Sequence, residues 1–382
     1  MLPKANRLND VKEYYFSIKL REVRSLMEQG KPIINLGIGS PDLSPPESVI
    51  NALNNSDVHG YQSYQGLPEL RRAMTSFYSR FYHVDLSEKN EILPLMGSKE
   101  GILHISMAFL NKGDQVLIPN PGYPTYASVT RLVEAEPLFY DLKESNSWQP
   151  DLKGLEKNDL SKVKIMWVNY PHMPTGSNGS EALFKDLIAF GKKHQILIVN
   201  DNPYSFILNE DPKSILAVEG AREVSIELNS LSKTFNMAGW RVGMVSGHKN
   251  HIEAVLKVKS NMDSGMYFGI QKGAIEALSL SSEWFEQMNE VYRKRRNLIW
   301  KICDKLNCIY DESSSGLFVW AKIPSGIKSE ELTDRILYDH DVFITPGTVF
   351  GTQGEGYIRF SLCIDESKIE EVYKRLSNME VL

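Results

Sequence analysis

One lysine of this sequence stands where an amine could act as a nucleophile and a base. Lys233 lies in the segment Ser230–Gly243, directly after the apolar run 224–229, which predicts a buried strand. Most lysines are solvated surface residues. At the end of a buried strand, between serines and apolar residues, partial loss of solvent would lower the pKa of this amine and make it reactive.

A glycine-bounded turn could bind an anion. Its residues, Gly97-Ser-Lys-Glu-Gly101, follow a predicted strand at 91–95 and open a predicted helix. Amide groups at a helix N-terminus point toward an anion, so Ser98 and the amide of Lys99 are candidate phosphate ligands. The alternative is that Ser98 caps the helix and does nothing else.

Two further charged residues lie in or directly after predicted strands. Arg359, in the run 356–362, offers a planar guanidinium that could bind a carboxylate through two hydrogen bonds. Without context, a strand arginine is more often part of a surface ion pair. Asp201 ends the apolar run 196–200, and its alternative role is a turn before Pro203.

The elements that must position these residues alternate along the chain. Apolar runs at 91–95, 115–118, 164–169, 196–200, 224–229 and 242–246 predict short buried strands, and helical patterns separate them. This alternation predicts an α/β fold with a mainly parallel sheet covered by helices on both faces. At 382 residues, the chain is long enough for two domains.

The pattern changes near residue 284. A long helix is followed by strands around 316–321, 342–344 and 356–362, with helices near 329–339 and 366–378. A polar helix is predicted at 8–28 and a short strand at 33–36. We therefore predict a large domain at 47–280 and a smaller α+β domain made of 1–46 and 281–382, with a cleft between them.

Taken in their order along the chain, the motifs resemble those of the class I/II aminotransferases of the aspartate aminotransferase fold type I, which depend on pyridoxal 5'-phosphate. The resemblance runs almost end to end, and its segments look most similar to the LL-diaminopimelate, aspartate and alanine aminotransferase branches. It implies a large domain with a mainly parallel seven-stranded sheet, and a Schiff base between the cofactor and Lys233. The matching segments are Gly37–Asp42, Tyr61–Arg71, Gly97–Gly101, Pro121–Tyr126, Asp201–Tyr204, Ser230–Gly243 and Arg359.

The resemblance also implies a role for each residue of the site. Asp201 would keep the pyridine nitrogen protonated, Tyr204 would donate to the phenolic oxygen, and Tyr123 would stack on the ring. Arg359 would bind the substrate carboxylate, with Gly39 in the loop that closes over it. The phosphate site would consist of Gly97, Ser98, Lys99, Ser230 and Arg241, joined by Tyr61 from the second subunit of a homodimer.

The implied reaction moves an amino group between an L-amino acid and a 2-oxo acid by a ping-pong mechanism. The substrate amine would displace Lys233, which would then move the α-proton. A pyridoxal-phosphate lyase or decarboxylase on the same fold is an alternative. Another is a non-catalytic sensor module fused to a DNA-binding segment, although no such segment precedes residue 30.

The chain departs from the family at one position. The family has Asn-Pro-Thr-Gly where this chain reads Met173-Pro-Thr-Gly176, and the family's asparagine donates to the cofactor's phenolic oxygen. A thioether cannot donate a hydrogen bond. Tyr204 would then hold the phenolic oxygen alone, or His172 or Asn169 would assist, and the pKa of the lysine–cofactor imine should rise.

The composition excludes other classes of protein. A formal net charge of −5 favours neither nucleic acid nor a membrane surface as a partner, and the run Arg293–Arg296 is interpreted as a solvated helix face or a contact between lobes. Three scattered cysteines and the lack of an apolar leader favour a cytoplasmic protein. No metal site is predicted, since His248 and His251 lack a third ligand.

Overall fold

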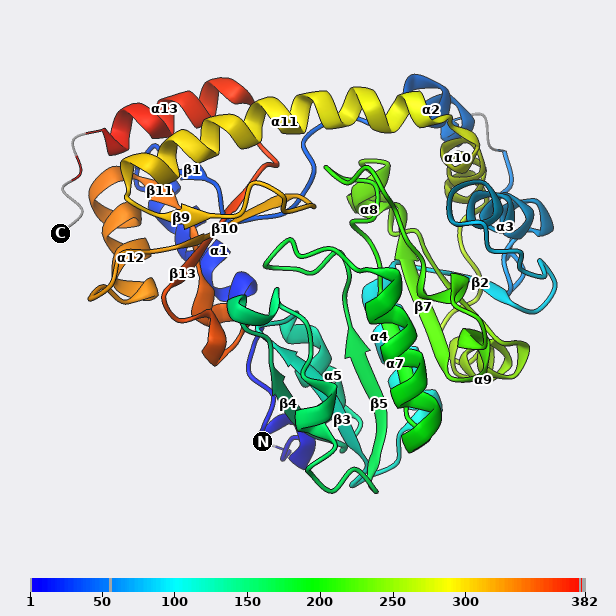
Figure 1. Cartoon of the computed structure of the whole chain (residues 1–382). Coiled ribbons are helices and arrows are strands. Elements are labelled where there is room, and N and C mark those ends of the chain that lie inside the picture. The colour runs from blue at the N-terminus through cyan, green and yellow to red at the C-terminus, as the bar shows by residue number, and fades with distance from the viewer. Residues whose placement is uncertain (1, 55–56, 378, 380–382) are drawn as a thin grey trace.

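A seven-stranded sheet forms the larger part of the computed structural model, which describes residues 2–54, 57–377 and 379 (Figure 1). The strand order is β2-β8-β7-β6-β5-β3-β4, and all neighbours are parallel except β8, which runs antiparallel to both β2 and β7. The prediction of a mainly parallel α/β sheet is confirmed. The strands are β2 (Ile92–Leu95), β3 (Gln115–Asn120), β4 (Glu136–Asp141), β5 (Val163–Val168), β6 (Leu197–Asp201), β7 (Ser225–Ser230) and β8 (Gly243–Gly247).

Strand β4 was not among the predicted strands. It lies at the edge of the sheet, and most of its side chains are partly or fully exposed, so it lacks the apolar run of a central strand. The central strands differ because both of their faces are buried. In β5, Ile165 and Trp167 pack into one apolar core, and Met166 and Val168 into another.

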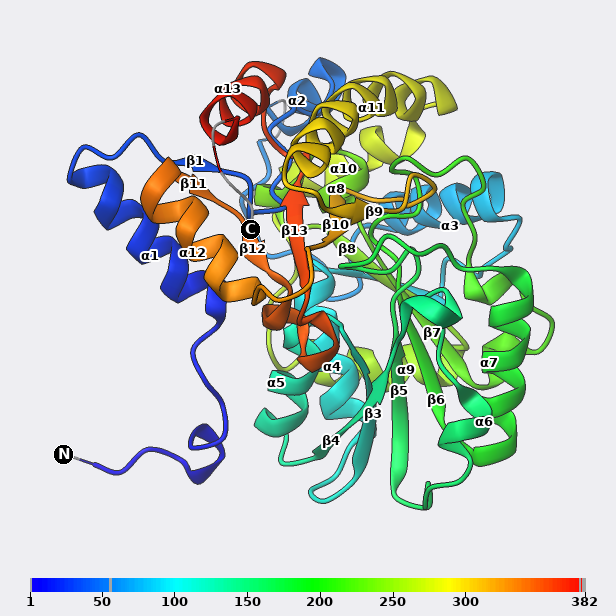
Figure 2. The same ribbon diagram turned by 60° about the vertical axis from the view of Figure 1, so that its left-hand side comes forward.

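Helices cover both faces of this sheet. Helices α4 (Ser98–Phe109), α5 (Pro124–Leu132) and α9 (Lys249–Lys259) cover one face, and α7 (Glu181–His194) packs on the other, as Figure 2 shows for α4, α5 and α7. Near the β2 edge, α2 (Glu47–Asn54), α3 (Pro68–Tyr82) and α10 (Phe268–Ser279) pack together (Figure 1). Two short helices complete this part, α6 (Leu152–Leu155) and α8 (Leu231–Thr234).

A second, antiparallel sheet has the order β12-β13-β10-β9. Its strands are β9 (Ile309–Tyr310), β10 (Phe318–Lys322), β12 (Thr345–Pro346) and β13 (Tyr357–Ser361), with α12 (Ser329–His340) and α13 (Glu366–Leu376) beside it. A separate pair joins β1 (Ile34–Asn35) to β11 (Val342–Phe343) in parallel. The long helix α11 (Ser282–Lys305) extends over both parts of the molecule (Figure 1). The domain boundaries at 47 and 281 stay a prediction.

The N-terminal helix is shorter than the predicted span 8–28. Helix α1 covers Tyr15–Glu28, because the backbone is extended at Tyr14, with φ −58° and ψ 128°. A separate 3-10 turn covers Asn6–Leu8. No helix among the described residues is long and apolar enough to cross a membrane.

Candidate active site

The predicted site residues meet at one edge of the large sheet. Strands β3, β5, β6 and β7 are parallel, so their carboxyl ends lie together, and β2 ends there as well because β2 and β7 are both antiparallel to β8. Asp201 ends β6 and Ser230 ends β7. Arg241 lies shortly before β8, and β8 begins at this same edge. Ligands of open α/β sheets bind at such an edge.

A cavity of about 380 Å³ opens at this edge. Ten of the predicted site residues line it: Gly39, Ser98, Lys99, Tyr123, Asp201, Tyr204, Ser230, Lys233, Arg241 and Arg359. The sequence did not single out several other lining residues, chiefly Tyr14, Phe16, Leu20, Ile38, Phe318 and Phe350. These apolar and aromatic side chains come from the N-terminal segment, from β10 and from the 3-10 turn that ends at Phe350, and no motif distinguishes them from ordinary core residues.

Lys233 lies in the one-turn helix α8, directly after β7. Burial lowers the pKa of its amine, the Cys363 thiol opposes this, and the positive charges of Arg359 and Arg241 add to the lowering. The amine donates a hydrogen bond to the carbonyl oxygen of Gly39. A Cβ atom at position 39 would lie 2.3 Å from the Phe318 ring, so only glycine allows this approach.

Asp201 presents one free carboxylate oxygen. Its Oδ2 accepts a hydrogen bond of 2.9 Å from the hydroxyl of Tyr126, whereas its buried Oδ1 has no partner among the described residues. Burial raises the pKa of Asp201 to about 6, although the Tyr126 hydroxyl opposes this rise. A buried acceptor without a partner is costly, and a protonated ring nitrogen in the cavity would supply the missing donor.

The other end of the cavity suits an anion. Ser98 begins α4, and its helix N-terminus points amide groups at this end. Arg241 donates to the Ala238 carbonyl over 2.9 Å and keeps further N–H groups for a ligand. Gly97 does not line the cavity, but a Cβ atom there would lie 2.2 Å from Nη2 of Arg241. Gly97 therefore makes room for this arginine.

Lys99 brings its side chain to the cavity as well as its amide. Its Nζ lies 4.4 Å from the centre of the Tyr14 ring. Burial lowers the pKa of this amine, and the charge of Arg241 acts in the same direction. The sequence predicted only the amide of Lys99 as a ligand. The contact with Tyr14 was not predictable from spacing, because the two residues belong to different parts of the chain.

Arg359 is buried in an aromatic cage. Its guanidinium lies 3.8 Å from the centre of the Phe318 ring and 4.6 Å from that of Phe350. Nη2 donates to the carbonyl oxygen of Gly37 over 2.7 Å. Burial lowers the pKa of Arg359 to about 10. Among the described residues, no carboxylate lies within ion-pair distance of it, which leaves the charge available for a ligand.

Of the two proposed substitutes for the family's asparagine, Asn169 is engaged by other groups and His172 lies away from the cavity. Asn169 lines the cavity, but its Oδ1 accepts from the Met173 amide over 2.8 Å and its Nδ2 donates to the Asp201 carbonyl. His172 lies 2.8 Å from the Thr175 hydroxyl through Nδ1 and does not line the cavity. Tyr204, which lines the cavity, is the remaining predicted donor.

Tyr61 lies outside the cavity of its own chain. Its side chain is 93% exposed. Tyr64, on the same loop, is also large and exposed. So are Met262 and Tyr267, on the loop that packs against it. The predicted role of Tyr61 therefore requires a second chain.

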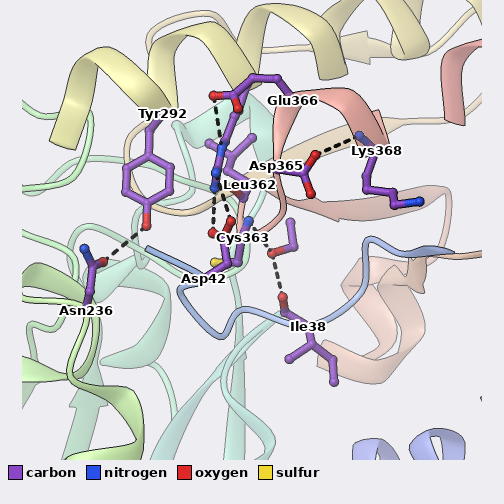
Figure 3. Close-up of polar contacts among 11 residues, drawn as sticks. Ile38, Asp42, Asn236, Tyr292, Leu362, Cys363, Asp365, Glu366 and Lys368 are labelled. Carbon is purple, nitrogen blue, oxygen red and sulfur yellow. Dashed lines mark hydrogen bonds and ion pairs between the residues drawn. The ribbon is translucent and has the colours of Figure 1, made fainter. Parts of the chain in front are cut away.

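The basic run 293–296 contributes a residue that the sequence did not assign to the site. Arg295 is buried, and it donates to both oxygens of Asp42 over 2.6 and 2.9 Å and to the Leu362 carbonyl over 3.0 Å, while Glu366 lies 3.4 Å away. Figure 3 shows Asp42, Leu362 and Glu366 around this point. Arg295 thus fixes the segment that carries Gly39. Helical spacing from the buried Tyr292 could have indicated its position.

Comparison with known proteins decides the family. Residues 31–376 match the family Aminotransferase class I and II. The chain belongs to this family. It is 38% identical over 383 residues to an LL-diaminopimelate aminotransferase of Aquifex aeolicus, covering 99% of both chains, and 37% identical to one of Halothermothrix orenii, covering 99% of this chain and 98% of the other. The predicted class, a pyridoxal-phosphate-dependent aminotransferase, is confirmed.

The fold agrees with solved structures. Substrate-bound BacF from Bacillus subtilis superposes with a TM-score of 0.95 at 32% identity, covering 99% of this aminotransferase and 98% of BacF. An aminotransferase from Staphylococcus aureus gives 0.89 at 29% identity, covering 98% of each chain. These comparisons confirm the predicted fold type.

Proposed function

We propose that Lys233, Asp201 and Arg359 carry the transamination performed by this enzyme. One observation supports the assignment: an amine of lowered pKa, a carboxylate with a free oxygen and a guanidinium with no carboxylate partner among the described residues border the same cavity. Pyridoxal 5'-phosphate, when bound, withdraws electrons from the α-carbon of the amino acid and so makes its proton acidic. The protein must hold the reactants and move that proton.

Each of the three residues has a separate task. The amine of Lys233, which its surroundings favour in the uncharged form, removes the α-proton and later returns it. Oδ1 of Asp201, which has no partner among the described residues, would accept a hydrogen bond from the ring nitrogen. Arg359 binds the α-carboxylate of the substrate through its forked N–H groups, which fixes the α-carbon beside Lys233.

The remaining predicted residues would hold the cofactor. Tyr123 would stack on the ring and Tyr204 would donate to the phenolic oxygen. The phosphate would be bound at the N-terminus of α4 and by Arg241, which line the cavity. Its ligands are Ser98, Lys99, Ser230 and Arg241, with Gly97 giving them room.

We infer that the amino donor has an uncharged, apolar side chain. Tyr14, Phe16, Leu20 and Ile38 also line the cavity, have no role assigned toward the cofactor, and are uncharged. Among the described residues that line it, Asp201 is the one carboxylate, and it is assigned to the ring nitrogen. A donor with a distal ammonium group would then find no counterion on this chain. LL-diaminopimelate is the second candidate, because relatives of 37–38% identity are named for it.

The active unit is proposed to be a homodimer, in which Tyr61 of each chain reaches the phosphate at the other's cavity. Its 93% exposure, beside other exposed apolar residues, supports this arrangement. We also propose a cytoplasmic location, which the free thiols of Cys303, Cys308 and Cys363 support.

A panel of donors tests the proposed function. Phenylalanine, leucine, glutamate and LL-diaminopimelate are each assayed with 2-oxoglutarate and with pyruvate. We expect stoichiometric exchange of amino and oxo groups, with the highest kcat/KM for an apolar donor. A highest value for LL-diaminopimelate would favour the second candidate. Release of ammonia or carbon dioxide without exchange would indicate a lyase or a decarboxylase instead.

A further inference from the structure

A buried group of charges that the proposed chemistry does not use lies behind the anion-binding turn. Lys259, the last residue of α9, is 1% exposed, and its Nζ lies 2.8 Å from Oδ2 of Asp263, which is 4% exposed. Completely buried lysines are rare and costly unless they are paired. This pair is therefore expected to hold other segments of the chain in place.

On one side, the pair holds the loop that carries Tyr61. Nζ of Lys259 donates to the carbonyl oxygen of Tyr64 over 2.9 Å, and Oδ1 of Asp263 accepts from the Gly265 amide over 2.8 Å. At Gly265, a Cβ atom would lie 2.5 Å from the Gln62 carbonyl, so the two loops are in tight contact. The ion pair joins both loops to the end of α9.

On the other side, the pair reaches the turn before α4. Ligand atoms of Asp263, His104 and Glu100 all lie within 4.8 Å of one another. Nε2 of His104, which is buried, lies 3.2 Å from Oε1 of Glu100. Oε2 of Glu100 accepts from the amide of Met96 over 2.7 Å, directly before Gly97 and Ser98. The ammonium group of Lys259 already supplies the cation of this group, so its geometry does not call for a metal ion.

We propose that Lys259, Asp263, His104 and Glu100 are positioning residues that couple the docking of a second chain to phosphate binding. The inference rests on the proposed homodimer and cofactor site. At one end, Lys259 joins the Tyr64 carbonyl to Asp263, and at the other end Glu100 binds the Met96 amide. His104 lies between them, 3.2 Å from Glu100 and within 4.8 Å of Asp263, and its ring nitrogens have no hydrogen-bond partner among the described residues. Burial makes the Lys259–Asp263 pair stronger and more costly to break than it would be in water. When a partner fixes the loop of Tyr61, the turn at Ser98 is fixed with it.

A comparison of how two ligands bind distinguishes a role in phosphate binding from a merely structural role. The full-length protein is freed of cofactor, and its dissociation constants for pyridoxal 5'-phosphate and for pyridoxal, which lacks the phosphate, are measured together with the dissociation constant of the dimer. We expect Lys259→Met to weaken pyridoxal 5'-phosphate binding about tenfold, the equivalent of one hydrogen bond, and to leave pyridoxal binding within about twofold. The dimer should dissociate at least about tenfold more readily.

The matched control lies on the same helix. Lys257 forms an exposed pair with Glu253 at 3.3 Å, so Lys257→Met removes the same charge without touching the buried group, and we expect it to change none of the three constants. Glu100→Gln is the milder second variant, since it keeps the volume and an acceptor for the Met96 amide. We expect it to lower the preference for the phosphate form in the folded protein.

The outcomes distinguish the coupling from the proposed function. Equal weakening of both ligands, or unchanged constants in folded Lys259→Met and Glu100→Gln, would overturn the coupling alone. If Lys259→Met does not fold, Glu100→Gln decides the matter in the same way. A wild-type protein that is monomeric and binds both ligands equally would overturn the homodimer and the phosphate site, and the coupling with them.

Discussion

The Sδ atom of Met173 lies 3.3 Å from Nη1 of Arg359. The thioether thus occupies a position beside the guanidinium without neutralising it, since sulfur is only a weak acceptor. Together with the aromatic rings of Phe318 and Phe350, it gives Arg359 a dry environment in which its charge stays available. A carboxylate that enters this environment gains two charge-assisted hydrogen bonds in a medium of low dielectric constant.

Replacing this arginine should separate substrate binding from cofactor binding. For Arg359→Leu, we expect kcat/KM for the amino donor to fall about a hundredfold or more, the equivalent of two charge-assisted hydrogen bonds. The affinity for pyridoxal 5'-phosphate should stay unchanged. The melting temperature should not fall, because the variant removes a buried charge that has no counterion. Steady-state kinetics and thermal unfolding measure these effects, and an unchanged kcat/KM would contradict the assignment.

Met173→Asn should restore a donor to the phenolic oxygen. The added hydrogen bond would stabilise negative charge on that oxygen, so the nitrogen that links Lys233 to the cofactor would lose its proton more easily. We expect its apparent pKa to fall by about one unit, the equivalent of about 1.4 kcal/mol. A pH titration of the visible absorbance measures it. Met173→Leu, which adds no donor, is the control, and an unmoved pKa in the asparagine variant would count against the proposal.

Asp201 should make the stability of the cofactor-free protein depend on pH. Its pKa is raised to about 6 in the folded chain, whereas an unfolded aspartate has a pKa of about 4. The folded state therefore holds this proton more tightly. The stabilisation is fully present below pH about 4 and is lost as the pH rises to about 6, by up to about 3 kcal/mol.

Chemical unfolding from pH 4 to 7 tests this dependence by comparing wild type with Asp201→Asn. The difference in unfolding free energy between them should change across that range and level off above it. With pyridoxal 5'-phosphate bound, the change in wild type should disappear, because the ring nitrogen donates to the free oxygen. Parallel curves for the two cofactor-free proteins would refute the raised pKa.

Hybrid dimers should show in which cavity Tyr61 acts. A chain with Tyr61→Ala and a chain with Lys233→Ala are each expected to be nearly inactive as homodimers. In a hybrid, the chain that keeps Lys233 would meet the intact Tyr61 of its partner, so equal mixing should restore about a quarter of the wild-type activity. If Tyr61 acts within its own chain, no hybrid has a complete site and no activity returns.

The fold could be predicted because its strands carry strong local signals. Buried strands are rich in Val, Ile and Leu, and Gly97, Asp201 and Lys233 stand in this order at or just after the ends of three of them. Edge strand β4 was missed, since an exposed strand has no such run. The start of α1 was placed too early, because nothing in the polar stretch before Tyr15 marks the extended backbone at Tyr14.

The site could be predicted only where one segment carries its own motif. Ser98, Lys233 and Arg359 each stand in such a segment. The cage around Arg359 and the contact between Lys99 and Tyr14 each join residues of different elements, so they depend on how those elements pack together. Pairings such as Arg295 with Asp42 have the same cause. The part of the cavity proposed to hold the side chain of the substrate could not be predicted for the same reason.

Borohydride reduction followed by peptide mapping tests the central claim most directly. The purified protein is loaded with pyridoxal 5'-phosphate, reduced and digested, and the labelled peptide is sequenced. We predict a single labelled lysine, Lys233, and no label in Lys233→Ala. A label on Lys99 or any other lysine in the wild-type protein, or no label at all, would contradict the account.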